Sequence, residues 1–399
     1  MTRRGRSVLA LGLVVYLAAW AFGSKPLYPV ATGLLLAVLL AWVWVHLANG
    51  PMRLHRNLGE REHVEGDEVQ IAVAVEPSGL LPVPGATLVE RVGMLGEQRH
   101  VLRRRGRRLA ITYVLARVRR GRYVFADSRV ELSDPFGLHR VDAPLPSPGA
   151  LLVYPRLVEL DRLFSETGAH AREGRRLVMR RRTGFDLHSV REYEQGESLR
   201  HVHWRSTARR GQLMVKELED APRDEIAVLL DANATAVAGE SFDVQVRVAG
   251  SILQAYLRRG RRAVLVVNAL RPESQRVHSP AGETRRALEL LAAAEPTAHA
   301  PAHMLLADEG SAAARALEVV VVTARVDRPL VDRLVQRALS RRKASLVFVD
   351  APTFAGAAPA RGPELLRLAG AGVAVAVVRS GDDLATVLQG AERQEAVGG

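Results

Sequence analysis

Oxygen-bearing side chains follow a short apolar run in the second half of this sequence. Asp231 comes directly after the run 226–230, and Asn233 and Thr235 follow at alternating positions. Continuous valine-rich runs are typical of strands buried on both faces of a parallel sheet, which binds ligands at the carboxyl ends of its strands. Alternating hard oxygen ligands are suited to Mg²⁺. The alternative interpretation is that Asp231 accepts backbone hydrogen bonds where the strand turns into a helix.

The same pattern recurs along the last part of the chain. Apolar runs alternate there with helical patterns, which predicts a doubly wound α/β sheet with right-handed crossovers. Three further runs end on a polar residue, namely Asn268, Thr323 and Asp350. The runs are 226–230, 263–267, 319–322, 346–349 and 373–378, and the helical patterns are 241–259, 283–294, 329–342 and 363–368.

A second concentration of chemically capable residues lies at 180–219. Charges, aromatics, glycines and histidines are interleaved there, without a clean helical or strand period in the first half. Long charged side chains flank Tyr193 and Trp204, which suits a partly buried ion-pair network with aromatic packing, because buried charges need partners. Such a network either braces the α/β domain or exposes one edge to a partner. The charged residues are Arg191, Glu192, Arg200 and Arg205.

The spaced polar positions of this segment carry a resemblance. They are Asp186, Arg191, Glu192, Tyr193, Gly196, Glu197, Arg200, Trp204, Arg205, Thr207 and Arg209. The pattern resembles the signature of a bacterial family, domain-of-unknown-function family fifty-eight. The chain departs from it at two positions where the family has Asp, because Glu197 keeps a carboxylate and His203 replaces one with an imidazole. The turn 133–138, Ser-Asp-Pro-Phe-Gly-Leu, also resembles a string of that family.

The resemblance implies a fold, a metal and a partner. Members of the family resemble von Willebrand factor A proteins, in which an Asp-x-Ser-x-Ser loop chelates a divalent ion. Asp231, Asn233 and Thr235 occupy those positions here, as a degenerate Mg²⁺ site. Thr284 would correspond to the separate threonine of that fold. The resemblance further implies partnership with a MoxR-type AAA+ ATPase in the assembly of an envelope complex.

The N-terminal residues predict a membrane hairpin. The apolar runs 8–22 and 28–48 are separated by a segment with one lysine, Lys25, and arginines lie before and after the pair. A span needs about 20 residues, so the second run is long enough and the first is at the short end. The positive-inside bias places both ends in the cytoplasm. Alternatively, the first run is a signal peptide cleaved after the motif at 19–21, which still leaves the residues after Pro51 in the cytoplasm.

Residues 52–152 have a different texture, in which loosely alternating runs are separated by Gly, Pro and Arg turns. This predicts an all-β, immunoglobulin-like module of the sandwich type. The expected organisation is a two-span transmembrane hairpin at 1–50, the β-sandwich-like module at 51–150, a linker and family signature segment at 151–222, and a von Willebrand A-like α/β domain at 223–399.

Composition narrows the function classes. The chain has no cysteine, which excludes disulfides, thiol nucleophiles and thiolate metal sites. Its net charge of +13 permits binding to nucleic acid or to an anionic membrane surface. Nucleic acid is not the expected partner, because no fold motif accompanies the arginines and aromatic residues are scarce. His188, His201 and His203 are spaced for a zinc site on a strand, although polar packing is the favoured interpretation.

These patterns favour a non-enzymatic function. No nucleophile elbow, phosphate-binding glycine loop or dinucleotide fingerprint is present, and nothing positions a substrate near the possible carboxylate pair Glu192 and Glu197. The leading interpretation is a multi-pass protein of the cytoplasmic membrane, a scaffold or adaptor that binds protein partners. The alternatives are a metal-assisted hydrolase that uses the strand-end acids, and a membrane-tethered nucleic-acid binder.

Overall fold

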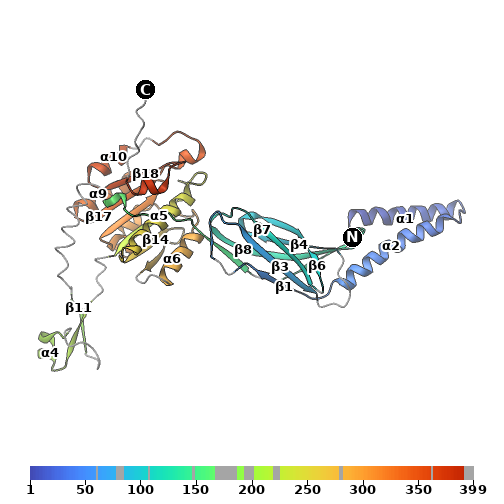
Figure 1. The fold of residues 1–399 in the computed structure, drawn as a ribbon, viewed down its shortest axis with the longest axis horizontal. Helices are drawn as coiled ribbons and strands as arrows, with labels where there is room; N and C mark the ends of the chain where they lie inside the picture. The colour runs from blue at the N-terminus through green and yellow to red at the C-terminus, as the bar shows by residue number, and fades with distance from the viewer. Residues whose placement is uncertain are drawn as a thin grey trace. The chain divides into compact units, whose positions relative to one another are not determined.

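The computed structural model describes residues 1–59, 62–77, 85–106, 108–145, 149–166, 187–192, 202–218, 225–277, 282–360 and 363–390 (Figure 1). The chain separates into two compact units, Met1–Tyr154 and Pro155–Gly399. The first unit contains an apolar helical hairpin and a β module, and the second contains the α/β sheet.

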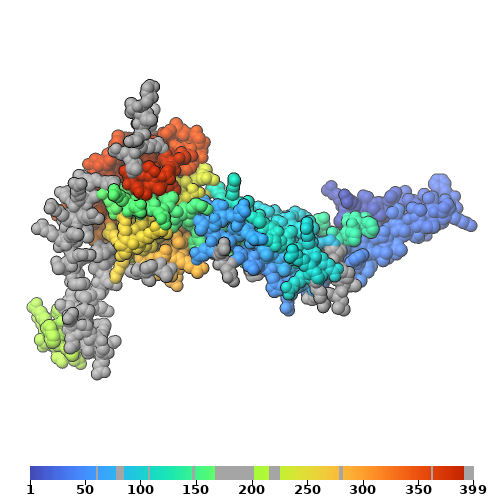
Figure 2. Space-filling model, in the orientation of Figure 1, coloured from blue at the N-terminus to red at the C-terminus, as the bar shows by residue number. Residues whose placement is uncertain are grey.

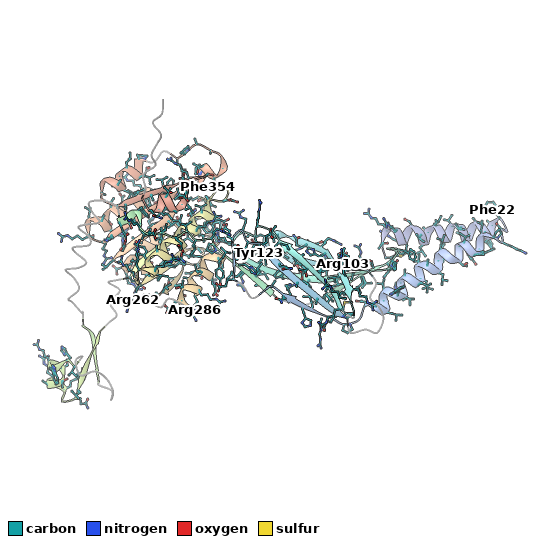
Figure 3. All side chains as sticks on the ribbon, viewed as in Figure 1. Phe22, Arg103, Tyr123, Arg262, Arg286 and Phe354 are labelled. Carbon is teal, nitrogen blue, oxygen red and sulfur yellow. The ribbon has the colours of Figure 1, made fainter. Side chains whose placement is uncertain are left out.

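Two antiparallel helices open the first unit, α1 (Arg3–Ala21) and α2 (Leu27–Ala48). Both are long and apolar enough to cross a membrane by length and composition, as the sequence predicts. Their mutual contact is close at Gly12, where a Cβ would lie 3.1 Å from the Leu35 side chain. Most other side chains face outward, and Phe22, at the turn between the helices, is 83% exposed (Figures 2 and 3).

The β module of the first unit consists of two sheets around one apolar core. The alternation of Val69, Ile71, Val73 and Val75 with exposed or half-buried residues in one strand is the period that this packing requires. One sheet has the order β1-β3-β7-β6 and the other the order β2-β10-β8-β4-β5, with β9 paired to β8. The strands are β1 (Met52–Asn57), β2 (His63–Val64), β3 (Val69–Pro77), β4 (Gly85–Val92), β5 (Glu97–Val101), β6 (Arg103–Arg105), β7 (Arg108–Leu115), β8 (Gly121–Ser133), β9 (Arg140–Pro144) and β10 (Gly149–Tyr154), with a 3-10 turn at Gly93–Leu95.

The second unit is built on a six-stranded sheet of order β15-β14-β13-β16-β17-β18, parallel except for β15. Its strands are β13 (Ile226–Asp231), β14 (Ala263–Asn268), β15 (Glu273–Val277), β16 (Glu318–Thr323), β17 (Lys343–Val349) and β18 (Ala374–Val378). The five runs that the sequence predicts as buried strands are β13, β14, β16, β17 and β18. The edge strand β15 is polar, and the sequence does not predict it.

Each face of this sheet carries its own apolar core, because alternate residues of a strand point to opposite faces. Ile226, Val228 and Leu230 pack with α5 (Ser241–Arg258), α6 (Gly282–Ala293) and α11 (Leu384–Leu388). Ala227 and Leu229 pack on the other side, with the helices α7 (His303–Ala307), α8 (Ala312–Arg315), α9 (Arg328–Leu339) and α10 (Pro363–Gly370). The layers are therefore helix, sheet and helix.

The start of the expected linker is packed rather than extended. Leu160, Leu163 and Phe164, the last of them in the 3-10 turn Phe164–Glu166, belong to the core that α5 shares with the sheet. Two ion pairs add to this contact, because Glu159 and Glu166 accept hydrogen bonds from arginines at the end of α5. Further along this segment, β11 (Leu187–Glu192) and β12 (Met214–Leu218) pair antiparallel around α4 (Trp204–Arg210).

Candidate functional site at the carboxyl edge of the α/β sheet

The strand order of the α/β sheet reverses next to β13. The chain passes from β13 to β14 on one side and later places β16 on the other side. In open sheets of this kind, the crevice outside the carboxyl ends at the reversal point is where ligands bind. Asp231 is the last residue of β13 and Thr323 the last of β16, so the topology brings both to this point.

Asp231 is 4% exposed and is held by neutral donors. Its Oδ1 accepts a hydrogen bond from Asn268 Nδ2 at 2.8 Å, and its Oδ2 accepts one from Thr323 Oγ1, also at 2.8 Å. Burial raises the pKa of the Asp231 carboxyl, and the hydrogen bonds from Asn268 and Thr323 oppose that rise. Both hydrogen-bond donors to the Asp231 carboxylate are side chains, whereas the alternative interpretation as a turn residue expects backbone N–H donors.

The polar side chains of the loop after Asp231 form hydrogen bonds with each other. Asn233 Oδ1 accepts hydrogen bonds from the Thr235 backbone N–H at 2.9 Å and from Thr235 Oγ1 at 2.7 Å. Asn233 forms an isolated parallel bridge with Ala298, whose N–H donates to the carbonyl of Ala232 at 2.8 Å. Asp231, Asn233 and Thr235 therefore lie together at the carboxyl end of β13 and in the loop after it. Whether they fit a metal ion is a separate question.

An exposed arginine lies over this closed network. The Arg325 N–H donates to Thr323 Oγ1 at 2.9 Å, and Arg325 Nη1 lies 3.5 Å from Thr235 Oγ1. The positive charge of Arg325 lowers the pKa of Asp231, and the negative charge of Asp327 raises it. Asp327 is occupied elsewhere, because its Oδ1 caps α9 by accepting from the Leu330 N–H at 3.0 Å. Sequence inspection missed Arg325, although its position just past a strand end was the available signal.

The arrangement does not fit a Mg²⁺ site. Mg²⁺ in proteins usually binds one or two carboxylates and keeps several waters, but both Asp231 oxygens and the Asn233 oxygen already accept hydrogen bonds from neighbouring side chains or the backbone. The positive charge that acts on Asp231 comes from Arg325. Thr284 lies in the first turn of α6, and no hydrogen bond in the described parts of the chain joins it to Asp231. Nor do those parts contain three His, Cys, Asp or Glu residues grouped to hold a metal.

A second buried acid follows β17, which is separated from β13 by β16. Asp350 comes directly after β17, is 1% exposed, and accepts from the Ala360 N–H at 3.2 Å. Arg379 Nε, from the loop after β18, lies 3.6 Å from its Oδ2. The 3-10 turn Ala351–Ala355 contacts the loop after β13, because a Cβ on Gly239 would lie 2.6 Å from the Phe354 carbonyl oxygen. Two strands on either side of β16, β13 and β17, are thus each followed by or end in a buried carboxylate with a more exposed guanidinium nearby.

The signature segment contains a helix held against a strand. His203 caps α4, because its Nδ1 accepts from the Ser206 N–H at 3.2 Å and lies 2.8 Å from Ser206 Oγ. The Met214 N–H, at the start of β12, donates to Thr207 Oγ1 at 3.0 Å. Gly211 ends the helix in the left-handed conformation, with its N–H on the Thr207 carbonyl. An imidazole therefore accepts the hydrogen bond at the N-cap of α4, at the position where the resemblance implies Asp.

The remaining signature residues fall into three sets. Trp204 is 67% exposed, and Arg205 and Arg209 are exposed on the same helix. The backbone of Arg191 and Glu192 lies in β11, opposite Val215 and Met214. The residues outside the described ranges are Asp186, Tyr193, Gly196, Glu197 and Arg200, together with His201 of the possible zinc set. The predicted network of Arg191, Glu192, Tyr193, Trp204 and Arg205 stays a prediction.

Comparison with known proteins supports the family resemblance. Residues 189–322 match the family model described as "Protein of unknown function DUF58". The chain is similar to the "Uncharacterized protein YeaD" of Bacillus subtilis (strain 168), with 30% identity over 159 residues, which are 40% of this chain and 39% of that relative. The solved structure of Cwp6 from Clostridium difficile aligns over 83% of this chain and 46% of its own at 9% identity. Its TM-score of 0.17 is too low to indicate a shared fold. Through the segment that holds α4, the Asp231 loop and β16, the chain belongs to the DUF58 family.

Proposed function

We propose that this protein is a membrane-anchored cytoplasmic scaffold or adaptor, whose von Willebrand A-like domain binds a protein partner at the carboxyl edge of its sheet. The observation that carries the proposal is the pairing of a closed, buried Asp231 network with the exposed guanidinium of Arg325. In a metal-dependent A domain, the ion offers a positive charge to a partner's carboxylate. Here Arg325 offers a permanent positive charge and several N–H donors at the same edge, in a geometry that suits a carboxylate.

Membrane anchoring rests on the helical hairpin. Arg3, Arg4 and Arg6 open α1, and Arg53 and Arg56 follow α2, so the basic residues gather at the two ends that the hairpin brings together. Under the positive-inside rule, these ends and the domains after them lie in the cytoplasm. The β module, which we take to be immunoglobulin-like, would then connect the membrane to the partner-binding domain.

The proposed partner is an acidic surface of a MoxR-type AAA+ ATPase. Its identity rests on the family resemblance alone, whereas its acidic chemistry rests on the arginines at the sheet edge, Arg325 and Arg379. A second contact is proposed for α4, where Trp204 is 67% exposed next to Arg205. Tryptophan and arginine are enriched among the residues that dominate binding energy at interfaces.

Co-purification from native membranes tests the sheet edge. We expect Arg325→Ala to retain its fold and to recover at least tenfold less partner, the scale of losing one charge-assisted hydrogen-bond pair. Arg286→Ala, at an exposed arginine of α6, is the matched control and should recover as much partner as the wild type. Equal recovery by the Arg325 variant and by the control would remove the sheet edge from the proposal.

The α4 contact is tested separately with Trp204→Ala. Because the ring is 67% exposed, the truncation should change the free energy of unfolding by no more than about 0.5 kcal/mol, as for other surface substitutions. Leu270→Ala, at a side chain that is 69% exposed outside this hairpin, is the control. A large loss of stability in the tryptophan variant would mean that α4 is a structural brace. Full recovery of the partner would exclude α4 as a contact.

A further inference from the structure

The turn 134–138 of the β module (Asp-Pro-Phe-Gly-Leu) packs closely against the first turn of α1. The Thr2 N–H donates to the Leu138 carbonyl at 3.1 Å, and Thr2 Oγ1 lies 2.6 Å from the Gly137 oxygen. The contact is so close that a Cβ on Gly5 would lie 2.1 Å from the Leu138 oxygen. Asp134, which is 4% exposed, shapes the turn by accepting from the Phe136 and His139 N–H groups at 2.9 and 2.6 Å.

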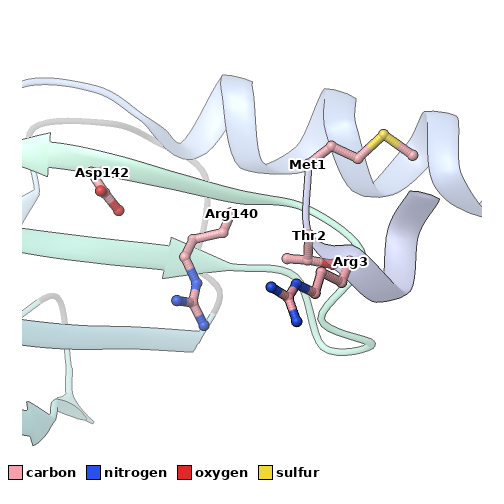
Figure 4. Close-up of a pocket in the computed structure, with 5 residues that line it drawn as sticks. All are labelled: Met1, Thr2, Arg3, Arg140 and Asp142. Carbon is pink, nitrogen blue, oxygen red and sulfur yellow. The ribbon is translucent and has the colours of Figure 1, made fainter. Parts of the chain in front are cut away.

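A cavity of about 450 Å³ lies beside this junction (Figure 4). It is lined by Met1, Thr2 and Arg3 at the start of α1 and by Arg140 and Asp142 of β9. Arg140 and Asp142 point to the same side of β9, because side chains two residues apart share a face of a strand. The charged side chains of the cavity are thus two guanidinium groups and one carboxylate, whereas the Thr2 hydroxyl already bonds the Gly137 and Leu138 oxygens.

The positive charge of this cavity is only partly neutralised by the protein. Arg140 Nη1 lies 3.1 Å from Glu131 Oε2, but the same oxygen lies 2.5 Å from Arg99 Nη2, so one carboxylate serves two arginines. A guanidinium has five N–H donors, which leaves Arg140 able to bind a second oxygen ligand. Arg3 is exposed on the first turn of α1.

The position along α1 places the cavity at the depth of lipid headgroups, if the hairpin spans the membrane as proposed above. Arg3 precedes the first apolar residue, Val8, by five residues, which is about 7.5 Å along a helix. The polar layer of a bilayer is about 5–8 Å thick on each side of the hydrocarbon core. Phe136, in the turn that packs against α1, is 74% exposed, which leaves an apolar ring able to enter that layer.

We infer that this cavity binds the headgroup of phosphatidylethanolamine. The lipid phosphate lies between Arg3 and Arg140, which supply the cationic donors that phosphate requires, and the lipid ammonium lies against Asp142. The presence of positive and negative side chains in one cavity matches a headgroup that carries both charges. Phosphatidylglycerol has the phosphate but no ammonium, and phosphatidylcholine has a quaternary ammonium that cannot donate a hydrogen bond to Asp142.

Native mass spectrometry of the full chain released from nanodiscs tests this inference. The discs contain equal parts of phosphatidylethanolamine, phosphatidylglycerol and phosphatidylcholine, and the lipid that remains bound is identified. We expect the wild type to retain phosphatidylethanolamine, and Arg140→Ala to retain about tenfold less of it. Arg91→Ala is the matched control, because Arg91 is an exposed arginine of the same module, 3.9 Å from Asp127 and outside the cavity.

Asp142→Asn distinguishes recognition of the lipid ammonium from recognition of the lipid phosphate. This variant should lose the preference for phosphatidylethanolamine over phosphatidylglycerol while still retaining phospholipid through the arginines. Equal retention of all three lipids by the wild type, or unchanged retention by Arg140→Ala, would overturn the inference. Displacement of the lipid by soluble glycerophosphoethanolamine would overturn it in favour of a soluble phosphate ester.

The same preparation distinguishes this inference from the proposed membrane anchoring on which it rests. Incorporation into nanodiscs is scored first, by co-elution of protein and disc. Incorporation without lipid preference overturns the headgroup site alone, whereas failure to incorporate overturns the membrane anchoring and the headgroup site together.

Discussion

Two buried carboxylates, one in each unit of the chain, have opposite surroundings. Glu90, in β4, is fully buried and is paired with Arg56, whose side chain is 4% exposed. Asp231, at the end of β13, is also buried, but its hydrogen-bond donors are the neutral side chains of Asn268 and Thr323. Among the described residues, the positive charge that lowers the pKa of Asp231 is that of the exposed Arg325.

The Glu90 network is enclosed in the core of its module, whereas the Asp231 network reaches the surface. Glu90 accepts from Tyr113 at 3.1 Å and from Ser128 at 3.2 Å, besides its pair with Arg56. Arg56 and Tyr113 come from one sheet of the β module, and Glu90 and Ser128 from the other, so the network ties the sheets together inside the core. The Asp231 network ends at the sheet edge, where its last member, Arg325, still has donors to offer.

The largest expected effect is on the enclosed network. Glu90→Ala leaves the guanidinium of Arg56 buried without its carboxylate, which should lower the free energy of unfolding by about 3–5 kcal/mol. Urea denaturation of the wild type and the variant measures the difference. Glu97→Ala, at a carboxylate whose side chain is 43% exposed, is the control and should cost far less. Equal losses in the two variants would mean that burial does not distinguish the Glu90 pair.

The free energy of unfolding should depend on pH through Asp231, and this dependence should be absent from Asp231→Asn. Burial raises the folded-state pKa of Asp231 above its unfolded value of about 3.9, so the folded protein binds this proton more readily between the two pKa values. The stability that the protonated carboxyl contributes is present at low pH and is lost as pH rises through the folded pKa. The wild type should therefore lose stability relative to Asp231→Asn as pH rises from 4 towards neutrality, measured by urea denaturation at each pH. A stability difference that is flat with pH would contradict the raised pKa.

Much of the α/β fold is predictable from the sequence, because its strands are buried on both faces. Runs such as 263–267 and 319–322 have no other plausible environment, and they are β14 and β16 in the structure. The strand β15 could not be predicted in this way, since Glu-Ser-Gln-Arg-Val pairs only along one edge and needs no apolar pattern. The two apolar helices are predictable for another reason, because each is a continuous apolar run close to the length that spans a membrane.

The candidate site is less predictable, because its decisive contacts join residues far apart in the chain. Asp231 and Thr323 stand out as polar strand ends, but their hydrogen bond spans 92 positions and depends on which strands are neighbours. The position of Arg325 just past a strand end is a weak signal, since the sequence contains many arginines and only the fold shows which one lies near Thr235. His203 is similar, because its capping of α4 appears only once the helix start is known.

A smaller effect is expected when the open network loses its cation. Arg325→Ala should change the free energy of unfolding by no more than about 0.5 kcal/mol, because the guanidinium is exposed. It should also raise the pKa of Asp231 further, since the positive charge of Arg325 lowers that pKa in the wild type. The pH series used for Asp231 measures both quantities, with Arg286→Ala as the control. A loss of stability comparable to that of Glu90→Ala would place Arg325 in a structural network like that of Arg56.

The smallest expected effect is that of Mg²⁺. An ion that binds only the folded state stabilises it by mass action, by about 2.7 kcal/mol when its concentration is one hundred times its dissociation constant. Because the Asn233 oxygen is already occupied by Thr235 and Arg325 supplies the positive charge near Asp231, we expect the melting temperature to be the same with and without millimolar Mg²⁺. Asp231→Asn provides the comparison, because it removes the charge that a specifically bound ion would need. A rise in melting temperature in the wild type that is absent from this variant would show that the sheet edge holds a metal after all, and that Arg325 gives way to it.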